Sequence, residues 1–248
     1  MSTSGEPGDR GAEPTGRAAW LELLASGEVE VEGRMPWSSN ATFLVQVTGE
    51  GGTARAIYKP EAGERPLWDY PSGLCAREVA AFELAVALGL EIVPETVLRE
   101  DGPYGRGSLQ RFIDADFEAH YFTLLEEPRH REALRCIAGF DLVANSGDRK
   151  GGHLLLAPSG QIFAIDNGLC LLVEDKLRTV MWDFAGEEVP DAVLAGCRVL
   201  AEAVPPALEA LLDDLECVAL MERAERLVAR PIFPHPWRDH RSYPWPLV

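Results

Sequence analysis

Short runs of β-forming residues alternate with polar turns along the first half of the chain. Five of these runs predict strands, at residues 29–31, 42–47, 54–58, 95–99 and 107–113. Two stretches with apolar residues at helical spacing, each ending in a glycine, predict helices at residues 18–27 and 75–89. The strands and the helix at 75–89 follow an order that is typical of a small, mostly antiparallel sheet with one helix.

Helical periodicity dominates the second half. Apolar residues on one side of residues 130–144 predict a helix, and residues 191–230 are mostly helix-forming. Between these helices, a polar loop at residues 145–152 leads into two short predicted strands at 153–156 and 162–165, joined by a turn that contains Pro, Ser and Gly. The second half therefore predicts a mainly helical lobe that contains one small hairpin.

The change of pattern predicts the domain organisation. Residues 1–17 are rich in Gly, Pro, Ser and Thr, and we expect them to form a disordered leader. We expect residues 18–248 to form a single domain, with an N-lobe over about 18–113 and a C-lobe over about 114–248. The predicted fold class is α+β, with two lobes.

Composition and charge restrict the function. The chain has 248 residues, of which 46% are hydrophobic, as in globular proteins with a real core. It holds 40 acidic and 23 basic residues, which give a formal net charge of −17. Because so acidic a surface repels nucleic acids and anionic membranes, we expect neither as a partner. Five scattered cysteines without a C-x-x-C pair, and no hydrophobic signal segment, predict reduced thiols in a cytoplasmic protein.

Two aspartates in the second half are candidates for chemistry. Asp148 lies in the polar loop, and Asp166 directly follows the second strand of the hairpin. The short hairpin between them is expected to bring both carboxylates together, with Lys150 close by. Carboxylates so placed can bind a divalent cation and handle a phosphate group. Each aspartate taken alone is equally typical of an ordinary turn.

Features of the first half fit phosphate binding. Lys59 directly follows a strand, and Glu78 lies near the start of the second helix, so an ion pair between them would orient the lysine towards phosphates. In the loop before the second strand, Ser38, Ser39 and Asn40 offer hydrogen-bond donors to a phosphate. Each feature alone also fits a solvated side chain or a polar hairpin loop.

The combined order of these features matches that of two-lobed kinases. The run D-L-V-A-N-S-G-D-R-K-G-G-H, followed by A-I-D-N-G, resembles the D-R-x-x-x-N and I-D-F-G motifs of the phosphoinositide 3-/4-kinase superfamily. The small bacterial relatives of that superfamily include the HipA-type serine/threonine kinases, and the resemblance covers about residues 30–230. It implies a bilobal protein-kinase-like α+β fold, with a small antiparallel-sheet N-lobe that carries one helix and a mainly helical C-lobe.

The resemblance also implies roles for the residues of the second half and for Lys59. It gives Asp148 the role of the catalytic aspartate, which positions or deprotonates the acceptor hydroxyl, and Lys150 that of neutralising the transferred phosphate. Asp166 would bridge Mg²⁺ or Mn²⁺ to the phosphates of ATP. Lys59 would contact the same phosphates, with Glu78 as its partner.

Further residues of the first half receive nucleotide-binding roles from the same resemblance. Ser38, Ser39 and Asn40 correspond to the loop that covers the phosphates. Gln110 and Phe112 lie where the adenine would hydrogen-bond to the backbone between the lobes.

Two positions depart from the pattern of the superfamily. His153 stands where the second metal ligand is an asparagine, and Asn167 replaces the phenylalanine of I-D-F-G. A neutral imidazole can ligate a divalent ion but suits softer metals than Mg²⁺, and a structural histidine is equally compatible with the sequence. We therefore expect a metal- and ATP-dependent kinase that acts on a protein or small-molecule hydroxyl. The alternatives are a nucleotide-binding pseudokinase and an enzyme that transfers AMP.

Overall fold

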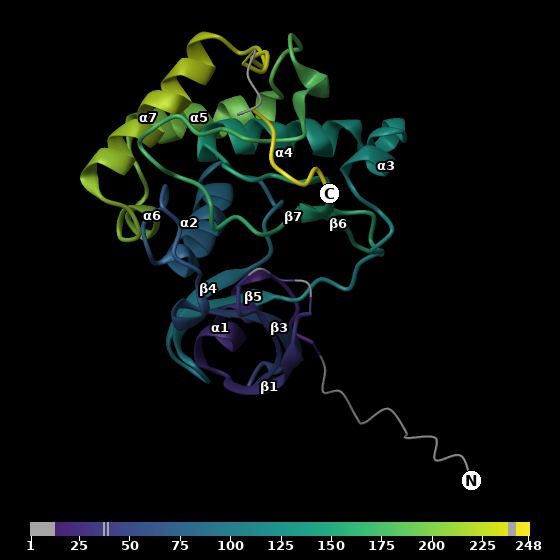
Figure 1. The fold of residues 1–248 in the computed structure, drawn as a ribbon, viewed down its shortest axis with the longest axis vertical. Coiled ribbons are helices and arrows are strands. Elements are labelled where there is room, and N and C mark those ends of the chain that lie inside the picture. Colours follow the sequence, from purple (N-terminus) through teal and green to yellow (C-terminus); the bar gives the residue numbers. More distant parts are fainter. Residues whose placement is uncertain (1–12, 37, 39, 238–241) are drawn as a thin grey trace. The chain divides into compact units, whose positions relative to one another are not determined.

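The computed structural model describes residues 13–36, 38, 40–237 and 242–248 (Figure 1). The chain divides into two compact units. The first, which we call the sheet unit, comprises Met1–Arg65 and Glu95–Phe112, and the second, the helical unit, comprises Pro66–Pro94 and Ile113–Val248. The chain therefore begins in the sheet unit and enters the helical unit at Pro66. It returns to the sheet unit at Glu95 and completes the helical unit from Ile113 onwards.

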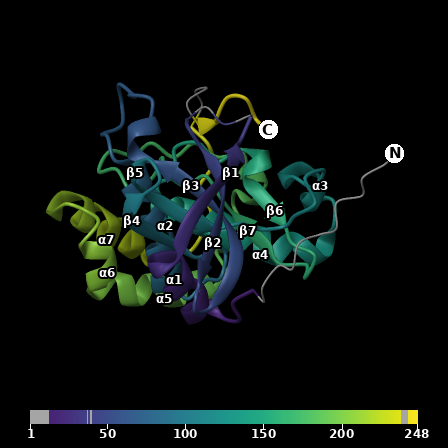
Figure 2. The same ribbon diagram turned by 90° about the horizontal axis from the view of Figure 1, so that it is seen from below.

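Five antiparallel strands form the sheet unit, in the order β1-β2-β3-β5-β4. Their bounds are Glu28–Arg34 for β1, Phe43–Gly49 for β2, Gly52–Pro60 for β3, Thr96–Gly102 for β4 and Gly105–Arg111 for β5. Figure 2 shows β1 and β2 side by side as twisted ribbons. The structure thus contains a strand at each of the five positions that the sequence pattern predicts in the first half.

One face of this sheet is covered by α1 (Arg17–Ser26). Trp20 and Leu24 of α1 pack into a core with alternate residues of β2 and β3, among them Tyr58. Because successive strand residues point to opposite faces, Lys59 lies on the face of β3 opposite Tyr58, where it is half-buried. The period-two pattern of β3 therefore separates its core residues from its candidate functional lysine.

The helical unit contains six α-helices and one hairpin among the residues that the structure describes. The helices are α2 Leu74–Ala87, α3 Tyr121–Leu125, α4 Arg131–Ala144, α5 Asp191–Glu202, α6 Pro206–Glu209 and α7 Asp214–Ala229, and the hairpin strands are β6 Leu154–Leu156 and β7 Ile162–Ala164. The helix α4 contacts α2, α3, α5 and α7. Its fully buried residues Leu134, Ile137 and Phe140 recur at helical spacing, which explains its place in the core.

One helix lies in a different unit from the one that the sequence suggested. The helix predicted at 75–89 was expected in the N-lobe, but α2 belongs to the helical unit, where it contacts α4, α5 and α6. Ten of its 14 residues are buried, so it needs neighbours on several sides rather than one sheet face. The helix of the sheet unit is α1 instead. Of the predicted leader, residues 1–12 lie outside the described residues.

Two expectations about the whole chain can be compared with the structure. All five cysteines are described, and none of them forms a disulfide, as the sequence predicts. Within the described ranges, no helix combines the length and the apolar character that crossing a bilayer requires.

Close packing of α5 against the end of α2 leads to a first prediction. A Cβ atom on Gly196 would lie 2.5 Å from the Leu88 Cα and 2.6 Å from its carbonyl oxygen. We expect Gly196→Ala to lower the free energy of unfolding by about 1–3 kcal/mol, as overpacked sites do, although alanine normally favours a helix over glycine. Chemical denaturation measures the change.

The exposed neighbour Ala195 provides a control for helix propensity. Ala195→Gly is expected to cost only about 0.5–1 kcal/mol, the propensity difference alone. A Gly196→Ala variant as stable as the wild type would contradict the close contact with Leu88.

Candidate functional site

The loop that carries Asp148 begins where α4 ends. Asn145 adopts a left-handed backbone conformation (φ 54°) at this end, and its side-chain oxygen accepts a hydrogen bond from the Lys176 N–H at 2.8 Å. Asparagine tolerates this conformation because its short side chain can hydrogen-bond locally. Two residues later, a Cβ atom on Gly147 would lie 1.9 Å from the Tyr70 hydroxyl oxygen, so the turn requires glycine.

A buried ion pair between Arg149 and Asp141 supports this loop. The two side chains are 1% and 0% exposed, and Arg149 Nη2 lies 3.0 Å from Asp141 Oδ1. Asp141 also accepts hydrogen bonds from Ser146 Oγ at 2.8 Å and Thr179 Oγ1 at 3.3 Å. Arg149 Nη1 donates to the Ile165 carbonyl oxygen at 2.7 Å. The pair therefore connects α4, the loop and the end of the hairpin.

Asn167 extends this network to α2. Its side-chain oxygen accepts from Arg149 Nη2 at 2.6 Å, and its amide nitrogen donates to the Ala164 carbonyl oxygen at 3.1 Å. Its backbone N–H donates to Glu78 Oε2 at 3.0 Å, and Glu78 is itself buried. A chain of buried polar contacts thus runs from Asp141 through Arg149 and Asn167 to Glu78.

Asp148, next to this buried network, forms an ion pair with Lys150. The Lys150 Nζ lies 2.9 Å from Asp148 Oδ2, and both side chains are mostly buried. Burial raises the pKa of Asp148, and the charge of Asp166 raises it further, while Lys150 and Arg178 lower it. The charge of Asp166 therefore acts on the Asp148 carboxyl, against the larger effect of Lys150.

Asp166 lies beside His153. Asp166 has a left-handed backbone conformation (φ 57°), which non-glycine residues seldom adopt. Its side chain is 54% exposed, and Oδ2 lies 3.4 Å from His153 Nε2. His153 Nδ1 in turn accepts a long hydrogen bond (3.4 Å) from the Lys150 N–H. The structure therefore brings together four residues that the sequence analysis singled out, namely Asp148, Lys150, His153 and Asp166.

The donor atoms of this cluster fit a divalent cation that is shared with phosphates. Mg²⁺ is usually held by one or two carboxylates, with phosphate oxygens and waters in its other positions. Among the residues that the structure describes, no three or more His, Cys, Asp and Glu side chains form a metal-binding group. Asp166 would be the carboxylate ligand, and the adjacent His153 adds a nitrogen donor that suits softer ions than Mg²⁺.

The residues predicted to bind the nucleotide phosphates belong largely to the sheet unit. Lys59 pairs in the sheet with Ser108 of β5, and its predicted ion pair with Glu78 of the helical unit stays a prediction. In the loop between β1 and β2, Ser38 Oγ lies 2.8 Å from Thr42 Oγ1.

Asn40, in the same loop, is held by a backbone group. Its side-chain oxygen accepts from the Arg65 N–H at 3.0 Å, which leaves the amide nitrogen as the donor it could offer to a phosphate. Ser39 lies outside the described residues.

Gln110 and Phe112 have structural partners within the sheet unit. The buried Gln110 side chain donates to Thr96 Oγ1 at 2.8 Å. The Phe112 N–H donates to the Arg55 carbonyl oxygen at 3.1 Å, and the Arg55 guanidinium lies over the Phe112 ring at 4.5 Å. The Phe112 N–H and one of the two side-chain N–H groups of Gln110 are therefore engaged within the sheet unit, and the predicted adenine contact stays a prediction.

The sequence analysis missed the supporting residues Asp141 and Arg149. One signal was present, because Asp141 is an acidic residue within the apolar run of α4, between Phe140 and Leu142. A charged residue in such a run is rarely buried without a partner. The identity of that partner could not be found from the pattern, since Arg149 lies in a loop that reads as solvated.

Comparisons with known proteins can now be set beside this geometry. The chain is 40% identical to Protein Rv2133c of Mycobacterium tuberculosis over 262 aligned positions, which cover 90% of this chain and 94% of that protein. This chain belongs to the same family as the mycobacterial protein. A scan against models of known protein families finds no match.

Solved structures of two other proteins share the fold of this chain. The Helicobacter pylori proinflammatory kinase CtkA matches with a TM-score of 0.52 at 13% identity, covering 84% of this chain and 94% of that one. Hydra Fam20, solved with sugar, matches with a TM-score of 0.50 at 12% identity, covering 85% and 87%. The predicted bilobal kinase-like α+β fold is therefore confirmed. The phosphoinositide-kinase and HipA-like branches stay predictions.

The buried ion pair generates a second prediction. Asp141→Asn leaves the Arg149 charge buried without a counter-charge, and we expect it to lower the free energy of unfolding by about 3–5 kcal/mol. The control, Glu61→Gln, breaks an ion pair with Arg106 in which both side chains are 37% exposed. Breaking such a pair should cost about 0–1 kcal/mol. Denaturant titration of both variants measures the difference, and similar small losses would contradict the structural role of Asp141.

A third prediction concerns the pH dependence of stability. The raised pKa of Asp148 means that the folded protein binds this proton more tightly than the unfolded chain does. The charged carboxylate therefore destabilises the fold at neutral pH, and this cost disappears as the pH falls towards the ordinary aspartate pKa. We expect Asp148→Asn, without ligands, to raise the Tm at pH 7 more than at pH 4.

Thermal unfolding at the two pH values measures this difference. The exposed Glu225 on α7 offers a control, since Glu225→Gln should produce no comparable change between the two pH values. An equal shift at both pH values for Asp148→Asn would show that burial of Asp148 has no electrostatic cost.

Proposed function

We propose that this protein is an ATP- and divalent-metal-dependent phosphotransferase that acts on a hydroxyl group of a protein or a small molecule. The observation that carries the proposal is the grouping of Asp148 with Lys150 and of Asp166 with His153 on one buried polar network. The kinase-like fold of its structural neighbours supports it. The net charge of −17 argues against a phosphoinositide acceptor in an anionic membrane.

Asp148 is the proposed proton acceptor. Its raised pKa makes its carboxylate a stronger base than that of an exposed aspartate. As the acceptor oxygen bonds to the γ-phosphorus, the bond from that phosphorus to the β,γ-bridging oxygen breaks, and the hydroxyl proton passes to Asp148. Lys150, which lies 2.9 Å from this carboxylate, would stabilise charge on the transferred phosphoryl group.

Other residues are proposed to hold the nucleotide. Asp166, with His153 beside it, would hold the cation, which when bound neutralises charge on the nucleotide phosphates. From the sheet unit, Lys59 and the loop residues Ser38, Ser39 and Asn40 would contact the same phosphates. No covalent enzyme intermediate is needed, because positioning and electrostatics account for phosphoryl transfer in kinases.

A pseudokinase is the second candidate, and one observation favours it. His153 occupies the position of the second metal ligand and lies 3.4 Å from Asp166 Oδ2, where a protonated imidazole would pair with the carboxylate instead of sharing a cation. In that case the protein would bind nucleotide and regulate a partner without transfer. AMP transfer on the same scaffold is a further form of the enzymatic hypothesis.

The decisive experiment is turnover with ATP labelled at the γ-phosphate, in the presence of Mg²⁺ or Mn²⁺. We expect the wild-type protein to transfer or hydrolyse the label, and Asp148→Asn to lose about 10²- to 10⁴-fold in rate while it still binds nucleotide. Asp166→Asn should lose most of the extra thermal stabilisation that the cation adds when nucleotide is present. Glu225→Gln should behave like the wild type in both assays.

The possible outcomes separate the candidate functions. Nucleotide binding by the wild type without turnover would favour the pseudokinase, and transfer of label from the α-phosphate would favour AMP transfer. Equal metal-dependent stabilisation of the wild type and Asp166→Asn would remove Asp166 from the site, and the kinase proposal would lose its main support.

A further inference from the structure

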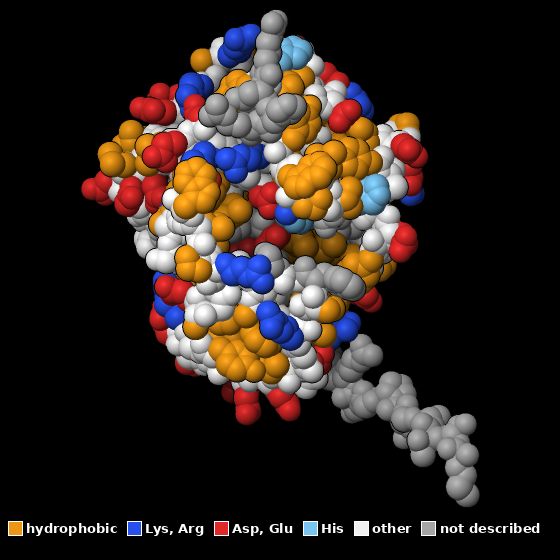
Figure 3. Space-filling view, in the orientation of Figure 1, with side chains coloured by type: hydrophobic (Ala, Val, Ile, Leu, Met, Phe, Trp, Pro, Cys, Tyr) orange, Lys and Arg blue, Asp and Glu red, His pale blue; other side chains and the backbone are white. Residues whose placement is uncertain are grey.

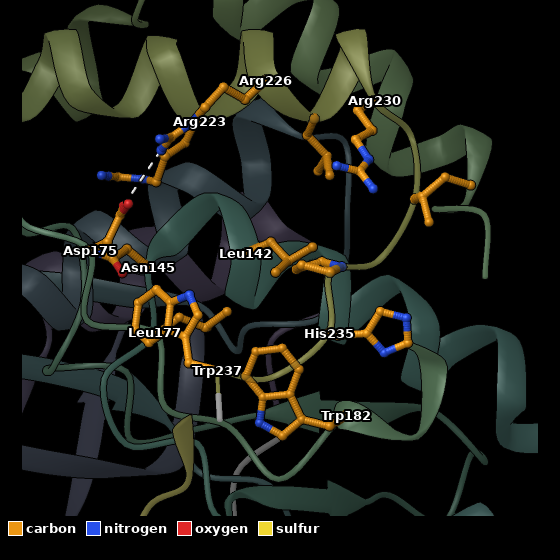
Figure 4. Close-up of a pocket in the computed structure, with 13 residues that line it drawn as sticks. Leu142, Asn145, Asp175, Leu177, Trp182, Arg223, Arg226, Arg230, His235 and Trp237 are labelled. Atoms are coloured by element: carbon orange, nitrogen blue, oxygen red, sulfur yellow. Dashed lines mark ion pairs between the residues drawn. The ribbon is translucent and has the colours of Figure 1, made fainter. Parts of the chain in front are cut away.

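A pocket of about 300 Å³ lies in the helical unit, and neither Asp148 nor Asp166 is among the residues that line it (Figure 4). Its walls come from α7, the C-terminal end of α4 and the segments around residues 175–182 and 232–237. This volume is at the lower end of the range for small-molecule sites. Basic and aromatic side chains supply the groups that could recognise a ligand, namely Arg223, Arg226, Arg230, His235, Trp182 and Trp237.

Arg223 is the residue in this pocket whose hydrogen bonds are incomplete. The residue is 6% exposed, and its Nε and Nη1 donate to the carbonyl oxygens of Val143 at 2.9 Å and Leu172 at 3.0 Å. Its Nη2 is buried and has no hydrogen-bond partner. Burial lowers the pKa of Arg223 to about 10, which reflects the cost of this poorly compensated charge. A buried guanidinium N–H without an acceptor is costly, and an anion in the pocket would remove that cost once a local side-chain movement exposes Nη2, which has almost no accessible surface in the structure.

The pocket is basic within an acidic protein. It is lined by three arginines and one acidic residue, Asp175, whereas the whole chain has a net charge of −17. Acidic side chains gather over α6 and α7 in Figure 3. In the sequence of these elements and the loop between them, Glu209, Asp213 and Asp214 are exposed. Asp175 lies 3.5 Å from Arg226 at a largely exposed position, and its charge also raises the pKa of Arg223 against the effect of burial. It therefore neutralises part of the positive charge of the pocket without giving Arg223 Nη2 a hydrogen-bond acceptor.

Aromatic side chains lie opposite the arginines. Figure 4 shows Trp182 and Trp237 across the pocket from Arg223, Arg226 and Arg230 of α7 and its C-terminal end. The Trp182 Nε1 donates to the Ser242 carbonyl oxygen at 3.0 Å, which holds this indole in place, while Trp237 is 52% exposed. An apolar or planar group can therefore lie against the indoles while a charged group reaches the guanidinium groups.

From these observations we propose that the pocket binds a small organic anion, whose phosphate or carboxylate group contacts Arg223 and Arg230 and whose ring or apolar part packs on Trp182 and Trp237. The site is separate from the proposed phosphotransfer site and requires no nucleotide. The pocket nevertheless adjoins the loop that carries Asp148. Asn145, at the start of that loop, lines the pocket, and its amide donates to the same Leu172 carbonyl oxygen as Arg223, at 3.2 Å. A bound anion would thus contact a residue three positions before Asp148.

Titration calorimetry of the full-length protein with model ligands tests the proposal. The probes are phenyl phosphate, inorganic phosphate and uncharged phenol, and tryptophan fluorescence gives a second signal. We expect phenyl phosphate to bind more tightly than either of the other two, because only it offers both an anion and a ring. Its affinity should fall as the salt concentration rises.

Variants of the pocket then locate the probe. Arg230→Gln, at an exposed position, should weaken phenyl phosphate binding by about tenfold, since a charged hydrogen bond contributes about this much. Arg223→Gln should weaken it at least as much, and Arg230→Gln keeps the test decisive if the buried variant does not fold. Asp175→Asn removes a competing negative charge and should strengthen binding several-fold. The exposed Arg198 of α5, outside the pocket, provides the control Arg198→Gln.

Three results would overturn the inference. The first is inorganic phosphate or phenol binding as tightly as phenyl phosphate, which would show that the pocket does not recognise an anionic group and a ring together. The second is an affinity unchanged by Arg230→Gln and Asp175→Asn. The third is binding lost in Asp166→Asn and retained in Arg230→Gln, which would place the probe in the proposed phosphotransfer site. None of these results depends on whether the protein turns over ATP.

Discussion

The guanidinium group of Arg149 is the contact on which the arrangement of the candidate site depends. Arg149 lies between Asp148 and Lys150 in the sequence, and its side chain bonds to the carbonyl oxygen of Ile165 and the side chain of Asn167. These are the two neighbours of Asp166 in the chain. One buried side chain therefore fixes both aspartates relative to each other. The planar, multidentate geometry of arginine suits this task, and a lysine could not make the same set of bonds.

Burying this charge is costly, and the protein compensates through Asp141. That aspartate receives hydrogen bonds from Ser146 and Thr179 as well as from Arg149, so the desolvated carboxylate has several donors. Such satisfied networks favour one arrangement over others because each broken bond leaves a buried polar group unpaired. Asn167, one of the two departures from the motif that the sequence resembles, has a structural role here. Asn167 replaces a phenylalanine, and it positions the strand end by hydrogen bonds instead of by packing.

Much of the fold was predictable from the sequence because the relevant signals are local. Alternation along β3, the amphipathic α4 and the turn residues of the hairpin each determine an element from a few neighbouring residues. The unit to which α2 belongs was not predictable in this way, since it depends on contacts with α4, α5 and α6, which are remote in sequence. Asp148, Lys150, His153 and Asp166 could be singled out because they lie in two short motifs, each of which is continuous in the sequence. The structural contacts of Asp141 and Gln110 were missed because their partners, Arg149 and Thr96, can be identified only in three dimensions.

The loop that carries these residues also touches the end of the chain. The Gly151 N–H donates to the Leu247 carbonyl oxygen at 2.7 Å, and a Cβ atom on Gly152 would lie 3.8 Å from a side-chain atom of Val248. Peptide added after Val248, such as an affinity tag, would therefore start beside the backbone that follows Lys150. A C-terminal tag would alter the surroundings of Gly151 and Gly152, and measurements on the Asp148 and Lys150 loop are best made on protein without one.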